Sequence, residues 1–459
     1  MEQITKPHCG ARLDRLPDCR WHSSMFAIVA FGLLVCWSNA VGGLILAQLK
    51  ALGWTDNSTT ATFSAITTAG MFLGALVGGI IGDKTGRRNA FILYEAIHIA
   101  SMVVGAFSPN MDFLIACRFV MGVGLGALLV TLFAGFTEYM PGRNRGTWSS
   151  RVSFIGNWSY PLCSLIAMGL TPLISAEWNW RVQLLIPAIL SLIATALAWR
   201  YFPESPRWLE SRGRYQEAEK VMRSIEEGVI RQTGKPLPPV VIADDGKTPQ
   251  AVPYSALLTG VLLKRVILGS CVLIAMNVVQ YTLINWLPTI FMTQGINLKD
   301  SIVLNTMSMF GAPFGIFIAM LVMDKIPRKT MGVGLLILIA VLGYIYSLQT
   351  SMLLITLIGF FLITFVYMYV CYASAVYVPE IWPTEAKLRG SGLANAVGRI
   401  SGIAAPYAVA VLLSSYGVTG VFILLGGGSI IVAIAIATIG IETKGVSVES
   451  LSIDAVANK

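Results

Sequence analysis

Long apolar runs separated by short polar segments fill most of the chain. A helix needs about 20 residues to cross ~30 Å of hydrocarbon, so each long apolar run predicts a membrane span. We count twelve such runs, at residues 25–49, 61–82, 89–107, 113–136, 150–174, 182–202, 266–291, 302–323, 331–348, 352–378, 391–413 and 418–440. The pattern therefore predicts an all-α membrane protein with twelve transmembrane helices.

One polar segment is far longer than the others and separates the first six spans from the last six. We expect two six-helix bundles, at 25–202 and 265–440, joined by a loop at 203–264 and flanked by tails at 1–24 and 441–459. In the loop, residues 215–231 place five apolar side chains on one helical stripe: Ala218, Val221, Met222, Ile225 and Val229. The stripe predicts an amphipathic helix near the inner lipid headgroups.

The distribution of charge predicts the orientation of the spans. Of the 33 Lys and Arg residues, 28 lie in the tails and every second loop, including 203–264, or within three residues of them, whereas the opposite loops hold only Lys50, Arg181 and Lys299. Because basic loops stay inside, both tails are expected to be cytoplasmic. The net charge of +9 is accounted for by these loops, so we expect no nucleic-acid partner.

Composition narrows the class further. Only 12% of the residues are charged, against roughly 25% in soluble domains, so most of the surface must face something other than water. The seven cysteines form no C-x-x-C pair, and their odd number argues against a disulfide framework. We expect no zinc site and no other metal.

Charged landmarks recur along the chain at a nearly constant distance. The segment 82–88 (GDKTGRR) predicts a tight charged turn after the second span, and a worn copy begins at Asp324, 241 residues after Asp83. Glu138 and Glu380 are 242 residues apart, and a third acidic pair follows spans 6 and 12. Such duplicated halves, with a path between them near the midplane, are the design of many secondary transporters.

Five motifs resemble the sugar porter and metabolite:proton symporter families of the major facilitator superfamily. They are GDKTGRR at 82–88, RFVMGVG at 118–124, PESPRWL at 203–209, PEIWPTEAKLRG at 379–390 and ETKG at 442–445. The resemblance covers nearly the whole chain. It implies two pseudo-symmetric six-helix bundles around a central cavity that opens alternately to each side. It also implies a monomer in the bacterial inner membrane.

The same resemblance implies a cytoplasmic gate. Inner-face charges would form ion pairs that hold the halves together when the cavity faces outward: Asp83, Arg87, Arg88, Glu138, Arg145, Glu204, Arg207, Asp324, Arg328, Glu380, Arg389, Arg399 and Glu442. Contacts present in one state only are what a conformational switch requires. The alternative is that these charges merely fix topology.

Departures from the family pattern leave two classes of substrate compatible with the sequence. Proton-coupled sugar porters carry an aspartate in helix 1 that pairs with the helix 4 arginine, but the corresponding stretch at 36–40 holds no acid. The double glutamine of helix 7 is reduced to Gln280, and the helix 5 glutamine position holds Tyr160. A sugar- or polyol-like substrate and an organic or aromatic acid are both compatible with this pattern.

Ionisable residues well inside a span, where a charge costs about 2.5–3.5 kcal/mol, are candidate functional groups, and Arg118, Glu95 and His98 are of this kind. Arg118 in span 4 would bind a substrate carboxylate, take part in coupling, or pair with Glu95. Glu95 and His98, three residues apart in span 3, share one helix face. They would relay protons or, because the family places helix 3 at the periphery, support a neighbouring helix.

Polar and aromatic residues of spans 5, 7 and 10 are candidates to line the cavity, with plain packing as the alternative for each: Asn157, Tyr160, Gln280, Tyr281, Asn285, Trp286 and Tyr372. Aromatic faces with a few amides suit a small polar metabolite. The glycines at 122–126 sit mid-span after no strand, so they predict no nucleotide loop.

The sequence therefore predicts a transporter rather than an enzyme, without a cofactor. Its expected partners are the lipid bilayer, a small-molecule substrate and H⁺, carried together by symport. A membrane sensor that binds ligand without transporting it is the alternative from another class.

Overall fold

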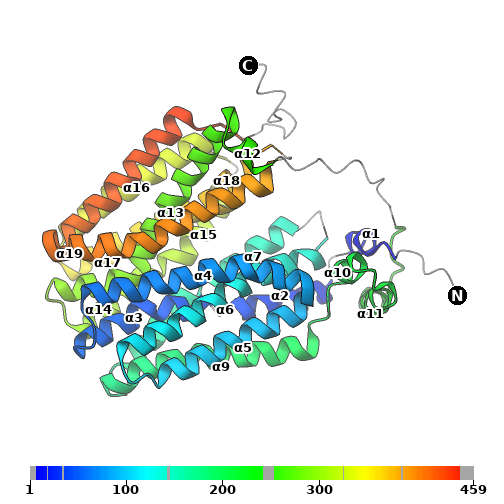
Figure 1. The fold of residues 1–459 in the computed structure, drawn as a ribbon, viewed down its shortest axis with the longest axis horizontal. Coiled ribbons are helices and arrows are strands. Elements are labelled where there is room, and N and C mark those ends of the chain that lie inside the picture. Colours follow the sequence, from blue (N-terminus) through cyan, green and yellow to red (C-terminus); the bar gives the residue numbers. More distant parts are fainter. Residues whose placement is uncertain are drawn as a thin grey trace. The chain divides into compact units, whose positions relative to one another are not determined.

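The computed structural model describes residues 7–17, 19–33, 36–141, 145–240, 253–323, 325–383 and 386–444. Within these ranges every regular element is a helix (Figure 1). Among the described residues, ten helical segments are long and apolar enough to cross a membrane, and some of them consist of consecutive helices. The predicted all-α membrane architecture is confirmed.

The first six predicted spans correspond to helices in chain order: α2 (Arg20–Leu33) with α3 (Trp37–Ala51), α4 (Asn57–Thr85), α5 (Arg87–Ala106), α6 (Met111–Tyr139), α7 (Arg145–Asn157) with α8 (Ser159–Leu170), and α9 (Ala176–Tyr201). The fifth span is thus two shorter helices, neither of which is long enough to count as a span alone. The start of α6 is set by Asn110, whose side chain accepts a hydrogen bond from the Phe113 amide at 2.9 Å.

The last six predicted spans follow the same order: α13 (Gly260–Thr293), α14 (Leu298–Met309) with α15 (Gly311–Val322), α16 (Arg328–Ser347), α17 (Met352–Val370) with η3 (Cys371–Tyr377) and α18 (Val378–Glu380), and α19 (Lys387–Ile439). Spans 11 and 12 are both within α19, which is interrupted at Gly417, where φ is 64°. With α19 counted as two spans and α7–α8 as one, the helices match the twelve predicted spans.

Four short or polar helices lie outside the spans: α1 (Cys9–Asp14), α10 (Pro206–Ser211), α11 (Tyr215–Thr233) and α12 (Tyr254–Leu257). Figure 1 shows α1, α10 and α11 lying together. The Ser205 side chain caps α10 by accepting from the Trp208 amide at 3.2 Å, and Pro206 occupies the first helical position.

Contacts divide the chain into two compact units. Unit 1 consists of Met1–Ser38, Gly70–Ser159 and Leu184–Gly246. Unit 2 consists of Asn39–Ala69, Tyr160–Gln183 and Lys247–Lys459. In unit 2, therefore, parts of spans 1, 2, 5 and 6 pack with the second set of six spans.

In unit 1, α4 has one face for helix packing and another for lipid. A Cβ atom added at Gly74 would lie 2.0 Å from the Val123 carbonyl oxygen of α6, so the two backbones meet at this glycine. A different face of α4 exposes a helical stripe of large apolar side chains: Leu73, Leu76, Val77 and Ile80. An apolar stripe open to the surroundings is stable only against an apolar medium, as expected of a membrane helix.

Candidate functional site: a buried polar cluster

The candidate site in unit 1 joins four helices through polar side chains. Arg118 of α6 donates from Nη1 to the Ser38 carbonyl oxygen of α3 at 2.7 Å. The Ser38 hydroxyl lies 2.9 Å from Nε2 of His98 on α5. The other ring nitrogen, Nδ1, lies 3.3 Å from the Ser191 hydroxyl of α9 and 3.8 Å from a carboxylate oxygen of Glu95. We call these five residues the polar cluster.

The polar cluster is sealed from solvent. Glu95, His98 and Ser38 are fully buried, and Arg118 is 2% exposed. Neither Glu95 oxygen completes a hydrogen bond with a residue that the structure describes, although Ser191 is its neighbouring hydroxyl. Burial of ionisable groups is costly unless they are paired, so the free energy of folding is sensitive to any change in the partners of this cluster.

The sequence predicted part of this arrangement. Glu95 and His98 do share one face of their helix, but His98 on this face contacts Ser38 of α3 and Ser191 of α9 and is acted on by the charge of Arg118 on α6. The expectation from the family that this helix lies at the periphery gave no hint of these contacts. Ser38 and Ser191 were missed, because a serine within an apolar run carries no signal of its partner.

The other predicted substrate residues lie in several environments. Asn157 donates to the Ser153 carbonyl of its own helix at 2.8 Å. The Tyr160 ring lies 5.5 Å from the Tyr367 ring of α17. On α13, Gln280 and Tyr281 are half-buried, whereas Asn285 and Trp286 are buried.

Tyr372 has a packing role in this structure. Its ring stacks on Tyr377 with centroids 5.0 Å apart, and a Cβ added at Gly332 of α16 would lie 2.4 Å from its hydroxyl oxygen. The Tyr377 hydroxyl in turn accepts from the Ile441 amide at 3.0 Å. Tyr372 therefore belongs to the end of the second set of helices that is predicted to be cytoplasmic.

In unit 2, contacts between the two sets of six spans occur near the predicted outer face. The Asn57 amide donates to the Ser414 hydroxyl at 2.9 Å, and Asn305 donates to Ser164 at 3.0 Å. At Gly43, α3 meets α13 so closely that an added Cβ would lie 2.4 Å from the Ile284 carbonyl oxygen. We call these three contacts the outer closure.

The charges of the first half that are predicted to lie at the cytoplasmic face form one connected group. Arg87 pairs with Asp83 at 2.6 Å and with Glu138 at 2.8 Å. Glu204 accepts from the Arg87 amide at 2.7 Å and from the Arg88 amide at 3.3 Å, so it caps the positive end of α5. The Gly86 turn has φ 97°, and a Cβ there would lie 2.2 Å from Glu204.

The second half repeats this group with the predicted offset. Arg328 pairs with Glu380 at 3.0 Å, and Glu442 accepts from the Arg328 and Lys329 amides at 2.8 and 3.1 Å. Pro327 replaces the turn glycine, yet α16 is still capped. The repeated charges are thus joined within each half, and a gate between halves would require them to change or share these partners.

The two capping carboxylates differ in their titration. Burial raises the pKa of Glu204 despite its hydrogen bonds from backbone amides. Burial also acts on Glu442, but hydrogen bonds from the Arg328, Lys329 and Lys444 amides outweigh it and lower its pKa. Two equivalent positions of the repeat therefore hold their protons over different pH ranges.

The remaining predicted gate residues fall into three groups. Arg207 donates to the Glu138 carbonyl at 3.0 Å and pairs with Asp14 at 2.9 Å. The Arg389 guanidinium lies 5.2 Å from the Tyr254 ring centroid, and Arg399 is half-buried on α19. Asp324 and the Arg145 side chain lie outside the described residues.

The amphipathic helix is confirmed as α11, but its apolar stripe does not face lipid headgroups. Met222, Ile225 and Val229 are buried against Cys9 and Leu13 of α1. The tail segment α1 covers the stripe because it supplies a matching apolar face of its own. Sequence periodicity alone cannot distinguish a stripe buried by protein from one buried by lipid.

Ion pairs hold the tail in place. Arg12 donates from Nε and Nη2 to the two carboxylate oxygens of Glu226 at 3.0 and 2.6 Å, and it also pairs with Glu219. Arg15 reaches Glu226 at 2.7 Å. Burial alone would raise the pKa of Glu226, but Arg12 and Arg15 outweigh this effect and lower it.

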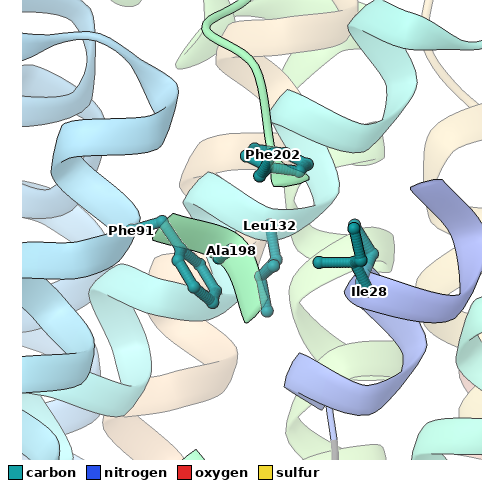
Figure 2. Close-up of a pocket in the computed structure, with 6 residues that line it drawn as sticks. Ile28, Phe91, Leu132, Ala198 and Phe202 are labelled. Atoms are coloured by element: carbon teal, nitrogen blue, oxygen red, sulfur yellow. The ribbon is translucent and has the colours of Figure 1, made fainter. Parts of the chain in front are cut away.

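Figure 2 shows a small apolar pocket in unit 1, lined by Ile28, Val29, Phe91, Leu132, Ala198 and Phe202. Phe91 lies two helical turns from His98 along α5. The pocket volume of about 10 Å³ is close to the least that can hold one water molecule, whereas ligand pockets are roughly 300–1,000 Å³. The pocket is therefore too small to be a substrate site.

Comparisons with known proteins agree with this architecture. The Major Facilitator Superfamily profile matches residues 26–406. The chain is 99% identical to the putative metabolite transport protein YdjK of Escherichia coli over the full length of both. It is 44% identical to the inner membrane metabolite transport protein YdjE of the same organism, covering 98% of this chain and 99% of YdjE.

Among solved structures, the fold matches a partially occluded inward open conformation of the xylose transporter XylE from E. coli. The TM-score is 0.73 at 18% identity, covering 94% of this chain and all of that one. This likeness shows the fold, with twelve helices in two related sets.

Proposed function

Because the chain belongs to the Major Facilitator Superfamily, we propose that it is a secondary active transporter that carries a small polar metabolite with protons by alternating access. The observation that carries the proposal is the outer closure. Its contacts are glycine-to-backbone or between neutral side chains, so they can separate at a small energetic cost. We place both tails in the cytoplasm, in line with the charge distribution.

We favour a neutral sugar- or polyol-like substrate. The Arg118 guanidinium is 2% exposed and donates to the Ser38 carbonyl, so its place in the polar cluster supports a role in coupling rather than capture of a carboxylate. The alternative substrate is an organic or aromatic acid, favoured by a buried arginine without an acid in span 1. The inner membrane is the expected location, as the name of YdjE states for that relative.

The first experiment separates the two substrate classes. The purified protein is screened by thermal shift against D-xylose, myo-inositol and benzoate, and any stabilising compound is then used as a radiolabelled substrate. Stabilisation by the neutral compounds is expected, and their binding should survive the substitution Arg118→Gln within about threefold. Stabilisation by benzoate alone, lost in Arg118→Gln, would establish the acid instead.

The second experiment tests transport itself. In proteoliposomes with an imposed pH gradient, the compound is expected to accumulate, and a protonophore should abolish this accumulation. Counterflow exchange should persist without the gradient. Binding without counterflow would make the protein a sensor, and accumulation that survives the protonophore would exclude proton coupling.

A further inference from the structure

Helix α3 belongs to both of the contacts described above. Ser38, at its start, takes part in the polar cluster through its hydroxyl and its carbonyl oxygen. Gly43, five residues later, forms the backbone contact with α13 in the outer closure. At 1.5 Å per residue these two positions are about 7.5 Å apart along one continuous helix. The two contacts are therefore carried by one helix, with fewer than two helical turns between them.

The polar cluster contains two groups that can bind a proton. Glu95 and His98 are the titratable groups of α5, and the groups that face them are Ser38 of α3, Arg118 of α6 and Ser191 of α9. A carboxyl oxygen of Glu95 lies 3.8 Å from Nδ1 of His98, and the Arg118 guanidinium acts on the same ring through its charge. The protonation of the ring therefore depends on where both neighbours lie.

A purely supporting role explains this cluster less well. A supporting carboxyl group would be expected to complete its hydrogen bonds, but neither Glu95 oxygen does so within the described residues. The adjacent core consists of Met102, Met121 and Ala188, where well-packed apolar side chains would stabilise the fold at lower cost. Retaining two ionisable groups here is consistent with a function that uses their charge.

We propose that Glu95 and His98 together hold the coupling proton, and that Ser38 links their protonation to the position of α3 at the outer closure. This inference rests on the proposed proton-coupled transport. It assigns the holding of the coupling proton to Glu95 and His98 of α5, whereas span 1 has no acidic residue that could hold it.

The proton balance is simple. The empty pair consists of the Glu95 carboxylate and a neutral His98 imidazole. One proton converts it to either the carboxylic acid with imidazole or the carboxylate with imidazolium, and the charge of the pair rises by one in both cases. Because the groups interact, the titration belongs to the pair and not to either residue. The proton is returned to water when the movement of α3 breaks the contact between Ser38 and His98.

The test measures the outer closure directly and needs no substrate. Nitroxide labels are placed by Ser58→Cys and Ser415→Cys, exposed positions next to the Asn57–Ser414 contact, in a chain whose seven native cysteines are replaced by Ser or Ala and whose thermal melting confirms folding. In lipid nanodiscs, continuous-wave and pulsed EPR give the populations with short and long label separation between pH 5 and 9. A one-proton switch changes their ratio by up to about tenfold per pH unit.

We expect the parent to titrate and Glu95→Gln to remain at the low-pH distribution throughout, because the amide imitates the protonated acid. Glu95→Asp, which keeps the carboxyl group, should titrate with a shifted midpoint. The matched control Glu177→Gln, at an exposed position of α9, should titrate like the parent. Ser38→Ala keeps both titratable groups and should reduce the pH-dependent change.

A parent that does not titrate, or a Glu95→Gln variant that titrates like the parent, would overturn the assignment. A full response in Ser38→Ala would overturn the link through α3. A normal EPR titration with no transport of any compound would instead refute the proposed function and leave the proton site standing.

Discussion

The contact at Gly43 gives the sharpest prediction about the transport cycle. In Gly43→Ala, the new Cβ would lie 2.4 Å from the Ile284 carbonyl oxygen and 3.0 Å from that of Asn285. Both obstacles are backbone atoms of α13, so no side-chain rotation relieves the overlap. Helices α3 and α13 must therefore separate, and the substitution opposes the outer-closed arrangement specifically.

The size of the effect follows from the cost of overpacking. One added methyl group in a tight contact typically costs about 1–3 kcal/mol. The cost applies only in the state in which α3 and α13 touch. It therefore raises the ratio of outer-open to outer-closed protein by roughly 5- to 150-fold. Alanine in place of glycine also favours the helix by up to about 1 kcal/mol in every state, and this term cancels between states.

The assay uses the same pair of nitroxide labels, at positions 58 and 415. Gly43→Ala is expected to enrich the long-separation population and to slow counterflow. Gly79→Ala is the matched control, because a Cβ at Gly79 in α4 meets no atom within 4 Å. Equal label populations in the two variants would refute the idea that this contact closes the outer face.

Three further predictions concern the inner face. Arg12→Ala should weaken docking of α1 by about 1–3 kcal/mol, since it leaves the partly buried Glu226 with less of its positive partner. The measurement is the rate of thiol labelling at Cys9, which is fully buried when α1 is docked. Burial first, and the nearby Glu210 next, raise the pKa of this thiol to about 12. Because the pKa of Glu226 is lowered, docking of α1 should be complete above about pH 5 and should weaken as the pH falls below the ordinary glutamate pKa of about 4.3. The rate of proteolysis of the tail between about pH 3 and 7 measures this change. On acidification Glu204 should take up its proton at a higher pH than Glu442, as infrared difference spectra of the two Gln variants would report.

Much of the fold follows from local chemistry. The twelve spans were predictable because a backbone in hydrocarbon must satisfy its own hydrogen bonds, so each long apolar run becomes a helix. The repeated charges at Glu138 and Glu380, predicted from spacing alone, occupy equivalent places beside Arg87 and Arg328. The gate between halves remains a prediction, since these pairs lie within each half.

The candidate site was predictable only in part. Residues three apart on a helix share a face, so Glu95 and His98 could be grouped from their spacing. Their partners Ser38, Arg118 and Ser191 come from three other helices, at distances along the chain that no local pattern encodes. The apolar stripe of α11 likewise did not predict that α1 would cover it, because α1 is distant along the chain.

Sequence by itself determined the class of the protein, its spans and its duplication, because hydrophobic length and charge act through short segments of chain. Tertiary structure alone decided which helix faces meet. Only the packed bundle brings Ser38 against His98 and sets Gly43 on the α13 backbone, since both contacts depend on how helices distant in sequence approach each other.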